Sequence, residues 1–206
     1  MGNDIYILGA GGHAKVLIAT LKANGYRVTA VYDDDRKLQG SVILDVPVMG
    51  RISDLSPDFQ KPAVIGIGDN HIRQTIARRF LQCPWVSVIH PGATVAESAK
   101  IGAGPVVFAG AVVQCDAEIG DHSIINTSAT VDHDCRIGDF SHIAPGAHLA
   151  GQVTIGNGVM AGIGCTVIQN LHIGDWTTIG AGAAVIRDLS ANITAVGVPA
   201  KPIRHH

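Results

Sequence analysis

Aliphatic residues recur at every sixth position over the second half of the chain. From Ile89 the sequence divides into 17 units of six residues, and the first residue of a unit is Ile, Val or Leu in 16 of them, with Ala161 as the exception. The fifth residue is Ala, Ser, Thr, Val or Cys in 14 units. An amphipathic helix repeats near 3.6 residues and a strand repeats every 2, so neither produces this period. The period predicts a hexapeptide solenoid.

In such a solenoid each unit supplies one short strand and one bend. The aliphatic first positions would point into a triangular prism, and the small fifth positions would fit its tight corners. Three units close one coil of about 18 residues, so we expect roughly five coils. The stacked coils would bury a continuous aliphatic ladder, which supplies the stability of the domain.

The first part of the chain has a different pattern. Residues 4–8 read as a strand, a glycine-rich turn follows, residues 12–24 read as a helix, and residues 27–32 read as a second strand. Another strand, glycine turn and helix follow within residues 63–82. This order predicts an α/β unit built from βαβ, a Rossmann-like half, ahead of the solenoid.

Composition agrees with two units. Charged residues make up 16% of the 206 residues and aromatic residues 4%, while 25 residues are glycine, so the apolar core must consist of small and aliphatic side chains. We expect a small α/β domain at residues 1–83, a solenoid at residues 84–191 and a C-terminal tail at residues 192–206.

Charge and hydrophobicity exclude several classes of partner. The net charge of -2 leaves no basic footprint for nucleic acid. No apolar run approaches the roughly 18 residues of a membrane span, and the N-terminus lacks a secretory pattern, so we expect a cytoplasmic protein without a membrane partner. The four cysteines stand far apart without a C-x-x-C pair, which predicts buried free thiols and no metal site.

The first glycine turn matches a dinucleotide fingerprint. Gly9, Gly11 and Ala14 fit G-x-G-x-x-A, and Asp33 follows about 20 residues later. Small residues there let backbone N–H groups at a helix N-terminus approach a phosphate. However, only about 80 residues precede the repeats, half of a full Rossmann domain, and His13 would crowd a pyrophosphate. A nucleotide-sugar fits better. An NAD-dependent enzyme and purely structural glycines stay as alternatives.

Lys15 and Arg73, on the two predicted helices, could contact phosphate. Ordinary exposed helix charges are the alternative interpretation of both residues.

The unit VDHDCR, residues 131–136, concentrates charge within the repeats. His133 lies in the middle of this unit, where side chains project outward, and Asp132 and Asp134 flank it. A carboxylate beside an imidazole fixes its tautomer and stabilises its protonated form. His133 is therefore a candidate general base, and an ordinary surface histidine is the alternative.

Together these segments resemble one known family. The glycine turn GAGGHAK, the aspartates DDD, the second turn GIGDNHIR, the hexads and the late segment GVPAK are similar to those of sialic-acid O-acetyltransferases and nucleotide-linked 4-amino-sugar N-acetyltransferases, which are hexapeptide-repeat acyltransferases. The resemblance implies a left-handed parallel β-helix, a homotrimer, and acetyl-CoA bound as co-substrate between subunits.

The resemblance also implies roles for individual residues. His133 would be the catalytic base. Asp134 would raise its basicity, but Asp is one methylene shorter than the usual Glu, so Asp132 is the alternative supporting residue. The nucleotide-sugar would contact Gly11, Gly12, His13, Asp33, Asp34, Gly68 and Asn126. Acetyl-CoA would contact His142, Ile163, Gly180, Ala181 and Lys201. A backbone N–H within 140–143 would stabilise the oxyanion.

The function that follows is N-acetylation of the 4-amino group of a nucleotide-linked amino-deoxy-sugar in glycan biosynthesis, by direct attack of the amine on acetyl-CoA. Two alternatives stay open: an O-acetyltransferase acting on sialic acid or another sugar hydroxyl, and a non-catalytic nucleotide-binding solenoid. The base, whether uracil, thymine or guanine, and the stereochemistry of the sugar are also open.

Overall fold

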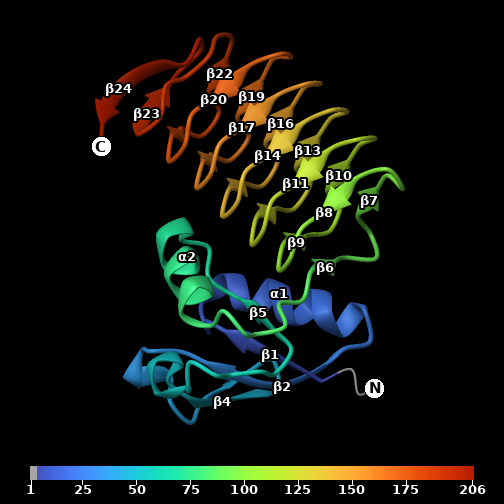
Figure 1. The fold of residues 1–206 in the computed structure, drawn as a ribbon, viewed down its shortest axis with the longest axis vertical. Coiled ribbons are helices and arrows are strands. Elements are labelled where there is room, and N and C mark those ends of the chain that lie inside the picture. The colour runs from blue at the N-terminus through green and yellow to red at the C-terminus, as the bar shows by residue number, and fades with distance from the viewer. Residues whose placement is uncertain (1–3) are drawn as a thin grey trace.

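A parallel sheet forms the centre of the N-terminal unit. The computed structural model describes residues 4–206 (Figure 1). Five strands lie in the order β3-β4-β2-β1-β5, parallel except for the antiparallel pair of β3 and β4. The strands are β1 (Asp4–Leu8), β2 (Arg27–Tyr32), β3 (Val42–Ile43), β4 (Val46–Gly50) and β5 (Ala63–Ile65).

Two α-helices cover this sheet. α1 (Gly12–Ala23) buries Ala14, Leu17, Ile18 and Leu21, which recur at the spacing of one helix face. α2 (Asn70–Arg79) follows β5, so both expected strand-turn-helix segments are confirmed. Short 3-10 turns cover 36–38 and 52–54. Within residues 4–206, no helix is long and apolar enough to cross a membrane.

The predicted solenoid consists of strands of two residues. They are β6 (Val88–Ile89), β7 (Thr94–Val95), β8 (Lys100–Ile101), β9 (Val106–Val107), β10 (Val112–Val113), β11 (Glu118–Ile119), β12 (Ile124–Ile125), β13 (Thr130–Val131), β14 (Arg136–Ile137), β15 (His142–Ile143), β16 (His148–Leu149), β17 (Thr154–Ile155), β18 (Met160–Ala161), β19 (Thr166–Val167), β20 (His172–Ile173), β21 (Thr178–Ile179) and β22 (Ala184–Val185). β23 (Ile193–Val196) and β24 (Lys201–His205) end the chain.

Three parallel sheets form the faces of the prism. Val112 pairs with Thr130 and Val113 with Val131, so strand partners lie 18 residues apart, one coil of three hexads. The domain-facing sheet runs from β6 to β21 and continues into β23 and β24, the second sheet from β7 to β22, and the third sheet from β8 to β20. The chain thus forms the expected left-handed parallel β-helix.

The interior of the prism follows the hexad pattern. First positions such as Val131, Ile137 and Ile143 are at most 3% exposed, and fifth positions such as Ala129 and Cys135 are fully buried. Burial of this aliphatic ladder stabilises the domain by about 25 cal/mol for each Å² of apolar surface.

Three of the four cysteines are buried as expected. The prediction was wrong for Cys115, which is exposed. It occupies the third position of its hexad, the same outward position as His133 one coil later, where the chain bends away from the core.

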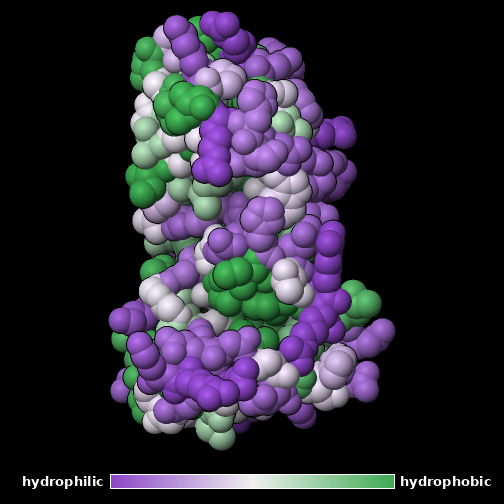
Figure 2. Space-filling model, turned by 90° about the vertical axis from the view of Figure 1, so that its left-hand side faces the viewer, coloured by the Kyte–Doolittle hydropathy of each residue, from purple (hydrophilic) through white to green (hydrophobic). Residues whose placement is uncertain are grey.

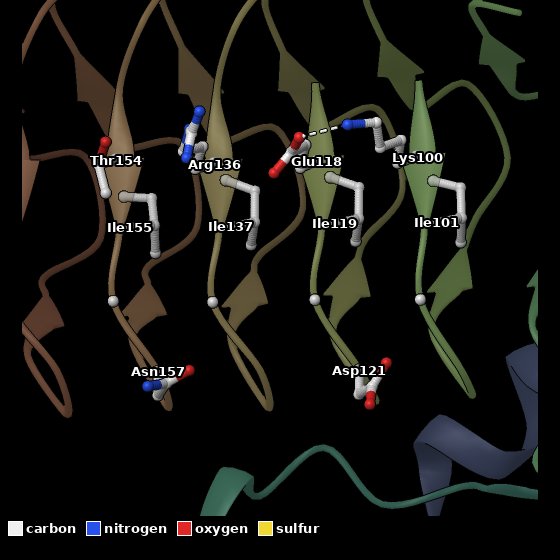
Figure 3. A pocket seen from close by; sticks show the side chains of 14 residues that line it. Lys100, Ile101, Glu118, Ile119, Asp121, Arg136, Ile137, Thr154, Ile155 and Asn157 are labelled. Carbon is white, nitrogen blue, oxygen red and sulfur yellow. Dashed lines mark hydrogen bonds and ion pairs between the residues drawn. The ribbon is translucent and has the colours of Figure 1, made fainter. Parts of the chain in front are cut away.

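Glycine and aspartate alternate in a second ladder along one corner. Asp139 Oδ1 accepts a hydrogen bond from the backbone N of Asp121, one coil earlier, at 2.8 Å. A Cβ on Gly120 would lie 2.5 Å from that oxygen, so the position before each such residue requires glycine. Figure 3 shows this face, with Asp121 and Asn157 near the turns and a row of isoleucines along the strands. The ladder explains the repeated I-G-D and I-G-N triplets.

The two units share one core. The buried face of α1 packs against Val88, Val106, Phe108 and Ile124. Val88, Val106 and Ile124 lie on strands of the domain-facing sheet, and Phe108 directly follows β9. Asn70 at the start of α2 donates to the carbonyl oxygens of Gly158 and Val159, at 3.0 and 3.2 Å. These contacts fix the N-terminal unit on the prism (Figure 1).

Candidate active site

A cavity of about 640 Å³ opens between the glycine turn, the end of β2 and α2. Ile52, Ile67, Ile72 and Ile76 supply its apolar walls. Figure 2 looks onto the side where α2 lies and shows a hydrophobic patch between the two units. The cavity brings together all six N-terminal residues that the sequence indicated for nucleotide-sugar binding, namely Gly11, Gly12, His13, Asp33, Asp34 and Gly68.

The start of α1 is open toward this cavity. No side chain caps the helix at Gly11, and a Cβ added to Gly11 or Gly12 would meet nothing within 4 Å. Packing within the chain therefore does not require these two glycines. Gly9 differs, because its φ is +115° and its Cβ would lie 3.0 Å from the backbone of Gly66. An uncapped helix N-terminus with open space before it is suited to bind an anion.

The two aspartates after β2 have different surroundings. Asp33 accepts hydrogen bonds from the backbone N of Ala10 at 2.7 Å and of Asp35 at 2.8 Å, so its carboxylate fastens the glycine turn to the end of β2. Asp34 accepts from the backbone N of Ser53 at 2.8 Å, and its side chain stays 55% exposed. Asp34 is thus the freer acceptor.

His13 lies at the inner end of the cavity. Burial, with a smaller contribution from the charge of Arg73, lowers the pKa of His13 to about 4. Its Nε2 atom is buried and has no hydrogen-bond partner among the described residues. The ring stands 6.2 Å from the ring of His142, measured between centroids. His13 is therefore a neutral imidazole with an unsatisfied nitrogen.

His142 and Asn126 continue from the cavity to the edge of the prism. Asn126 Oδ1 accepts from the backbone N of Thr127 at 2.8 Å, so its Nδ2 faces His142 Nε2 at 2.9 Å. His142 Nε2 must then be an acceptor, and Nδ1–H points to the carbonyl of Gly68 at 3.4 Å. Burial and the charge of Arg73 lower the pKa of His142 to about 3. This tautomer is neutral and held on both sides.

The other residues indicated for acetyl-CoA lie farther along the stack. Ile163 and Ala181 occupy the edge between the domain-facing and second sheets, the same edge as Asn126, and Ile163 is 62% exposed. A Cβ on Gly180 would lie 2.7 Å from Val196 Cγ1. Lys201 pairs with Val196 across β23 and β24. The coenzyme roles of these residues and of His142 stay predictions.

His133 projects from the edge between the second and third sheets. Its Nδ1 lies 2.7 Å from Asp134 Oδ2, and its side chain is 55% exposed. The hydrogen bond with Asp134 raises the pKa of His133, and the charges of Asp132 and Asp134 act in the same direction. Asp132 accepts instead from the backbone N of His133, at 2.7 Å. The shorter acid at position 134 therefore reaches the ring.

Two of the amides expected near an oxyanion are already bonded. The backbone N of Phe140 donates to the carbonyl of Asp121, and that of His142 donates to the carbonyl of Val159, both at 2.8 Å. They belong to the ladder between coils. The expectation of a free N–H within 140–143 does not hold for these two groups.

The structure does not bring every predicted residue together within one chain. The cavity lies against the domain-facing sheet, whereas His133 lies at the opposite edge of the prism, between the other two sheets. Asn126 and His142 stand beside the cavity.

Arg73 is the residue that the sequence pattern misplaced. It was expected as an exposed helix charge or a phosphate contact, but it is 2% exposed and donates to carbonyl oxygens of both units. Its spacing from Ile76, Ala77 and Phe80 is that of one helix face, and all three are buried. That period was the signal that could have placed Arg73 inside.

Family models match both units. Residues 4–80 match the PglD N-terminal domain, and residues 116–151 match the bacterial transferase hexapeptide of six repeats.

Solved structures match the whole length. One is a mutant of GDP-perosamine N-acetyl transferase from Caulobacter crescentus, with a histidine replaced by alanine, in complex with CoA and GDP-perosamine: 40% identity, TM-score 0.92, covering 98% of this chain and 97% of that one. Another is the acetyltransferase domain of PglB from Neisseria gonorrhoeae in complex with acetyl coenzyme A: 41% identity, TM-score 0.91, covering 98% and 100%.

A curated relative matches over a shorter segment. It is UDP-N-acetylbacillosamine N-acetyltransferase of Bacillus subtilis, 39% identical over 113 residues. The alignment covers 52% of this chain and 51% of that protein, so the matched segment spans about half of the relative.

Proposed function

The chain belongs to the nucleotide amino-sugar N-acetyltransferase family, and from this premise we propose that it transfers the acetyl group of acetyl-CoA to the 4-amino group of a nucleotide-linked amino-deoxy-sugar. The observation that carries the proposal is the pairing of an open, uncapped helix N-terminus in a cavity of about 640 Å³ with an exposed histidine held by a carboxylate.

The features of the cavity support a substrate that binds through its nucleotide diphosphate. Backbone N–H groups at the start of α1 would bind the diphosphate, because Gly11 and Gly12 leave space there. The isoleucine walls would cover the faces of the base, and Asp34 would accept from its N–H edge. The named relatives act on GDP-linked and UDP-linked sugars, so the base is left to experiment.

His133 would act as general base. Its Nδ1 donates to Asp134, which leaves Nε2 free to take the proton of the amine as the nitrogen attacks the thioester carbonyl. The C–S bond then breaks, and the leaving thiolate of coenzyme A receives a proton. The products are an acetamido sugar and free coenzyme A. No covalent enzyme intermediate is required, which agrees with the burial of Cys135.

A homotrimer would complete the site. The outward positions of the second sheet hold no Asp, Glu, Lys or Arg; they are Thr94, Val112, Thr130, His148, Thr166 and Ala184. The third sheet instead shows Lys100, Glu118 and Arg136 to solvent, in the row visible in Figure 3, with Lys100 and Glu118 2.8 Å apart. Desolvating the second sheet costs less, so we propose it as the contact between copies.

This contact would place His133 of one chain beside the Asn126 edge of its neighbour. Both edges border the second sheet. Exposed Ile168 and Ile186 lie farther along the edge of His133, and exposed Ile163 lies along the edge of Asn126. These apolar side chains would line the groove for the pantetheine arm of acetyl-CoA.

The first experiment replaces the base. We expect His133→Ala to lower kcat by about 10² to 10⁴, with the fold and the oligomeric state retained. Circular dichroism and sedimentation check the fold, and release of the coenzyme A thiol measures the rate. The matched control is His172→Ala, which removes an exposed histidine from the third sheet. Equal rates for both variants would contradict the role of His133 as general base, and no thiol release by the wild type would leave a non-catalytic solenoid.

The second experiment identifies the acceptor. Purified protein and acetyl-CoA are incubated with GDP-, UDP- and dTDP-linked 4-amino sugars and with free sialic acid, and products are read by mass spectrometry. An increase equal to one acetyl group on a nucleotide amino sugar supports the proposal. Turnover of sialic acid alone rejects it in favour of O-acetylation.

A further inference from the structure

Arg73 carries a buried positive charge that touches no carboxylate among the described residues. The residue is 2% exposed, and every hydrogen bond that it donates ends on a carbonyl or amide oxygen. An unpaired buried charge is costly unless surrounding dipoles replace water. Six carbonyl and amide oxygens around the guanidinium take the place of that water.

All five N–H groups of the guanidinium are accounted for. Nε donates to the carbonyl of His122 at 2.7 Å. Nη1 donates to the carbonyls of Ile67 and Gly68, both at 3.1 Å. Nη2 donates to Asn70 Oδ1 at 2.8 Å and to the carbonyl of Phe140 at 2.7 Å. Lysine offers three donors without this planar fork, so it could not replace the set.

The acceptor groups of Arg73 belong to two parts of the molecule, the rim of the cavity and the prism. Ile67 and Gly68 form the rim of the nucleotide-sugar cavity, while His122 and Phe140 lie at the corners of two successive coils. The side chain of Arg73 thus ties the cavity rim to the prism.

One acceptor is shared with the candidate site. The carbonyl of Gly68 takes both Arg73 Nη1–H and, at 3.4 Å, His142 Nδ1–H. Because His142 Nε2 faces Asn126, a single line of contacts runs from Arg73 through Gly68 and His142 to the edge of the prism.

The groups that face this cluster are mostly histidines. His13 comes from α1, His142 from β15 and His122 from the corner before β12. Asp69 caps α2 and raises the pKa of Arg73, but burial dominates and lowers it to about 10, so Arg73 stays charged at neutral pH. Asp121 acts on His122 in the opposite direction to Arg73. After burial, the charge of Arg73 lowers the pKa of His13 and of His142.

We propose that Arg73 is a positioning residue for the reaction, a role that rests on the proposed function: its guanidinium holds the Gly68 carbonyl so that His142 keeps Nδ1–H inward and presents Nε2 to Asn126 at the acceptor site. Arg73 acts through these residues and does not touch the substrate.

The kinetic test compares two arginines of the same helix. We expect Arg73→Gln to raise KM for the nucleotide amino sugar by about tenfold, because the cavity rim and Asn126 move. Arg73→Lys keeps the charge and should show a smaller rise. Arg78→Gln, which removes an exposed arginine of α2 outside the cavity, is the control and should match the wild type.

A spectroscopic test reads His142 without catalysis. In protein labelled with ¹⁵N-histidine, with His142→Gln for assignment, the wild-type ring should carry its proton on Nδ1 and should not titrate between pH 5 and 8. Arg73→Gln should raise its pKa or mix its tautomers. A wild-type His142 that titrates in this range, or that carries its proton on Nε2, overturns the proposal even where the variants do not fold.

Unchanged KM and unchanged His142 signals in folded Arg73→Gln also overturn it. The two proposals fail separately. If the wild type acetylates no nucleotide amino sugar, the proposed function fails, while the tautomer of His142 and its response to Arg73→Gln are still measured.

Discussion

At the scale of single residues, the contact between His133 and Asp134 decides at which pH the imidazole is free to accept a proton. The carboxylate raises the pKa of His133, so the imidazole becomes neutral only at higher pH. We expect Asp134→Asn to move the acid limb of kcat/KM to lower pH and to lower the plateau, because the neutral ring is then a weaker base. Asp132→Asn, which removes a neighbouring charge but no hydrogen bond to the ring, should shift the limb less. Equal shifts would contradict the assignment of Asp134.

The buried histidines make stability depend on pH. Burial lowers the pKa of His122 to about 4, while an unfolded histidine has a pKa near 6.5. Between these values the unfolded chain binds a proton that the folded chain does not, so stability is complete above pH 6.5 and falls as the pH drops toward 4. Each such group contributes a slope of about 1.4 kcal/mol per pH unit.

His122→Asn tests this slope. Asparagine tolerates the φ of +53° at this position, so the backbone is retained. Denaturant unfolding from pH 4.5 to 7.5 should show a variant whose stability falls less steeply with acid than that of the wild type, whatever its stability at neutral pH. Parallel curves would show that His122 is protonated in the folded state.

The residues of the site differ in how far sequence could predict them. The glycine turn and the aspartates after β2 were expected to contact one ligand; they line one cavity, because loops at the ends of neighbouring parallel strands meet, and their binding role stays a prediction. The hydrogen bond between His133 and Asp134 could not be predicted from the sequence. It depends on the φ of +59° at Asp134, and the residue type alone does not determine that angle. Arg73 was missed because a charge within a helix normally points to solvent.

At the scale of elements, the hexads contain two kinds of glycine: one is required by close packing between coils, the other by the backbone conformation. Gly138 has no unusual φ, but its Cβ would lie 2.6 Å from the carbonyl carbon of Gly156, so the next coil leaves no room. Gly146 has a φ of +65° with nothing within 4 Å, so only its backbone conformation matters.

These two positions should respond differently to substitution. We expect Gly138→Ala to destabilise the fold by roughly 1–3 kcal/mol, because backbone atoms of the next coil must move. Gly146→Asn should cost less than about 1 kcal/mol, since asparagine adopts positive φ readily. Chemical denaturation of both variants measures the difference, and a larger loss for Gly146→Asn would refute this division.

Most elements followed from the period alone. The first positions of the hexads predicted the strands, and the strand pairs indeed lie one coil apart. The 3-10 turns at 36–38 and 52–54 were not predicted, because they depend on local contacts such as the bond from the backbone N of Lys37 to Asp35 Oδ1 at 2.9 Å.

At the scale of the whole molecule, the separation of His133 from the cavity leads to a test of assembly. Gly11→Asp would place a negative charge in the proposed diphosphate site, and His133→Ala would remove the proposed base, so each variant alone should have little activity. Co-expressed chains should regain activity at about one quarter of the sites, where a Gly11→Asp chain supplies the histidine and a His133→Ala chain supplies the cavity. Mixed trimers without activity would mean that both parts of a site come from one chain.

The junction of the two units was beyond the reach of sequence patterns. Each unit can be recognised from the period of its own sequence. Asn70 and Arg73, however, donate to carbonyl groups roughly 50 to 90 positions away, and no local pattern indicates such contacts.

The 18-residue coil has a geometric consequence for symmetry. Asn126 and His133 follow β12 and β13, which succeed each other within one coil, so they lie near one level along the prism axis, whereas His142 pairs with Ile124 from the next coil. A pure rotation about an axis parallel to the prism can therefore bring the histidine of one copy to the asparagine of another with no rise along that axis. Rotation without rise closes into a ring, whereas any offset would generate a helical fibre.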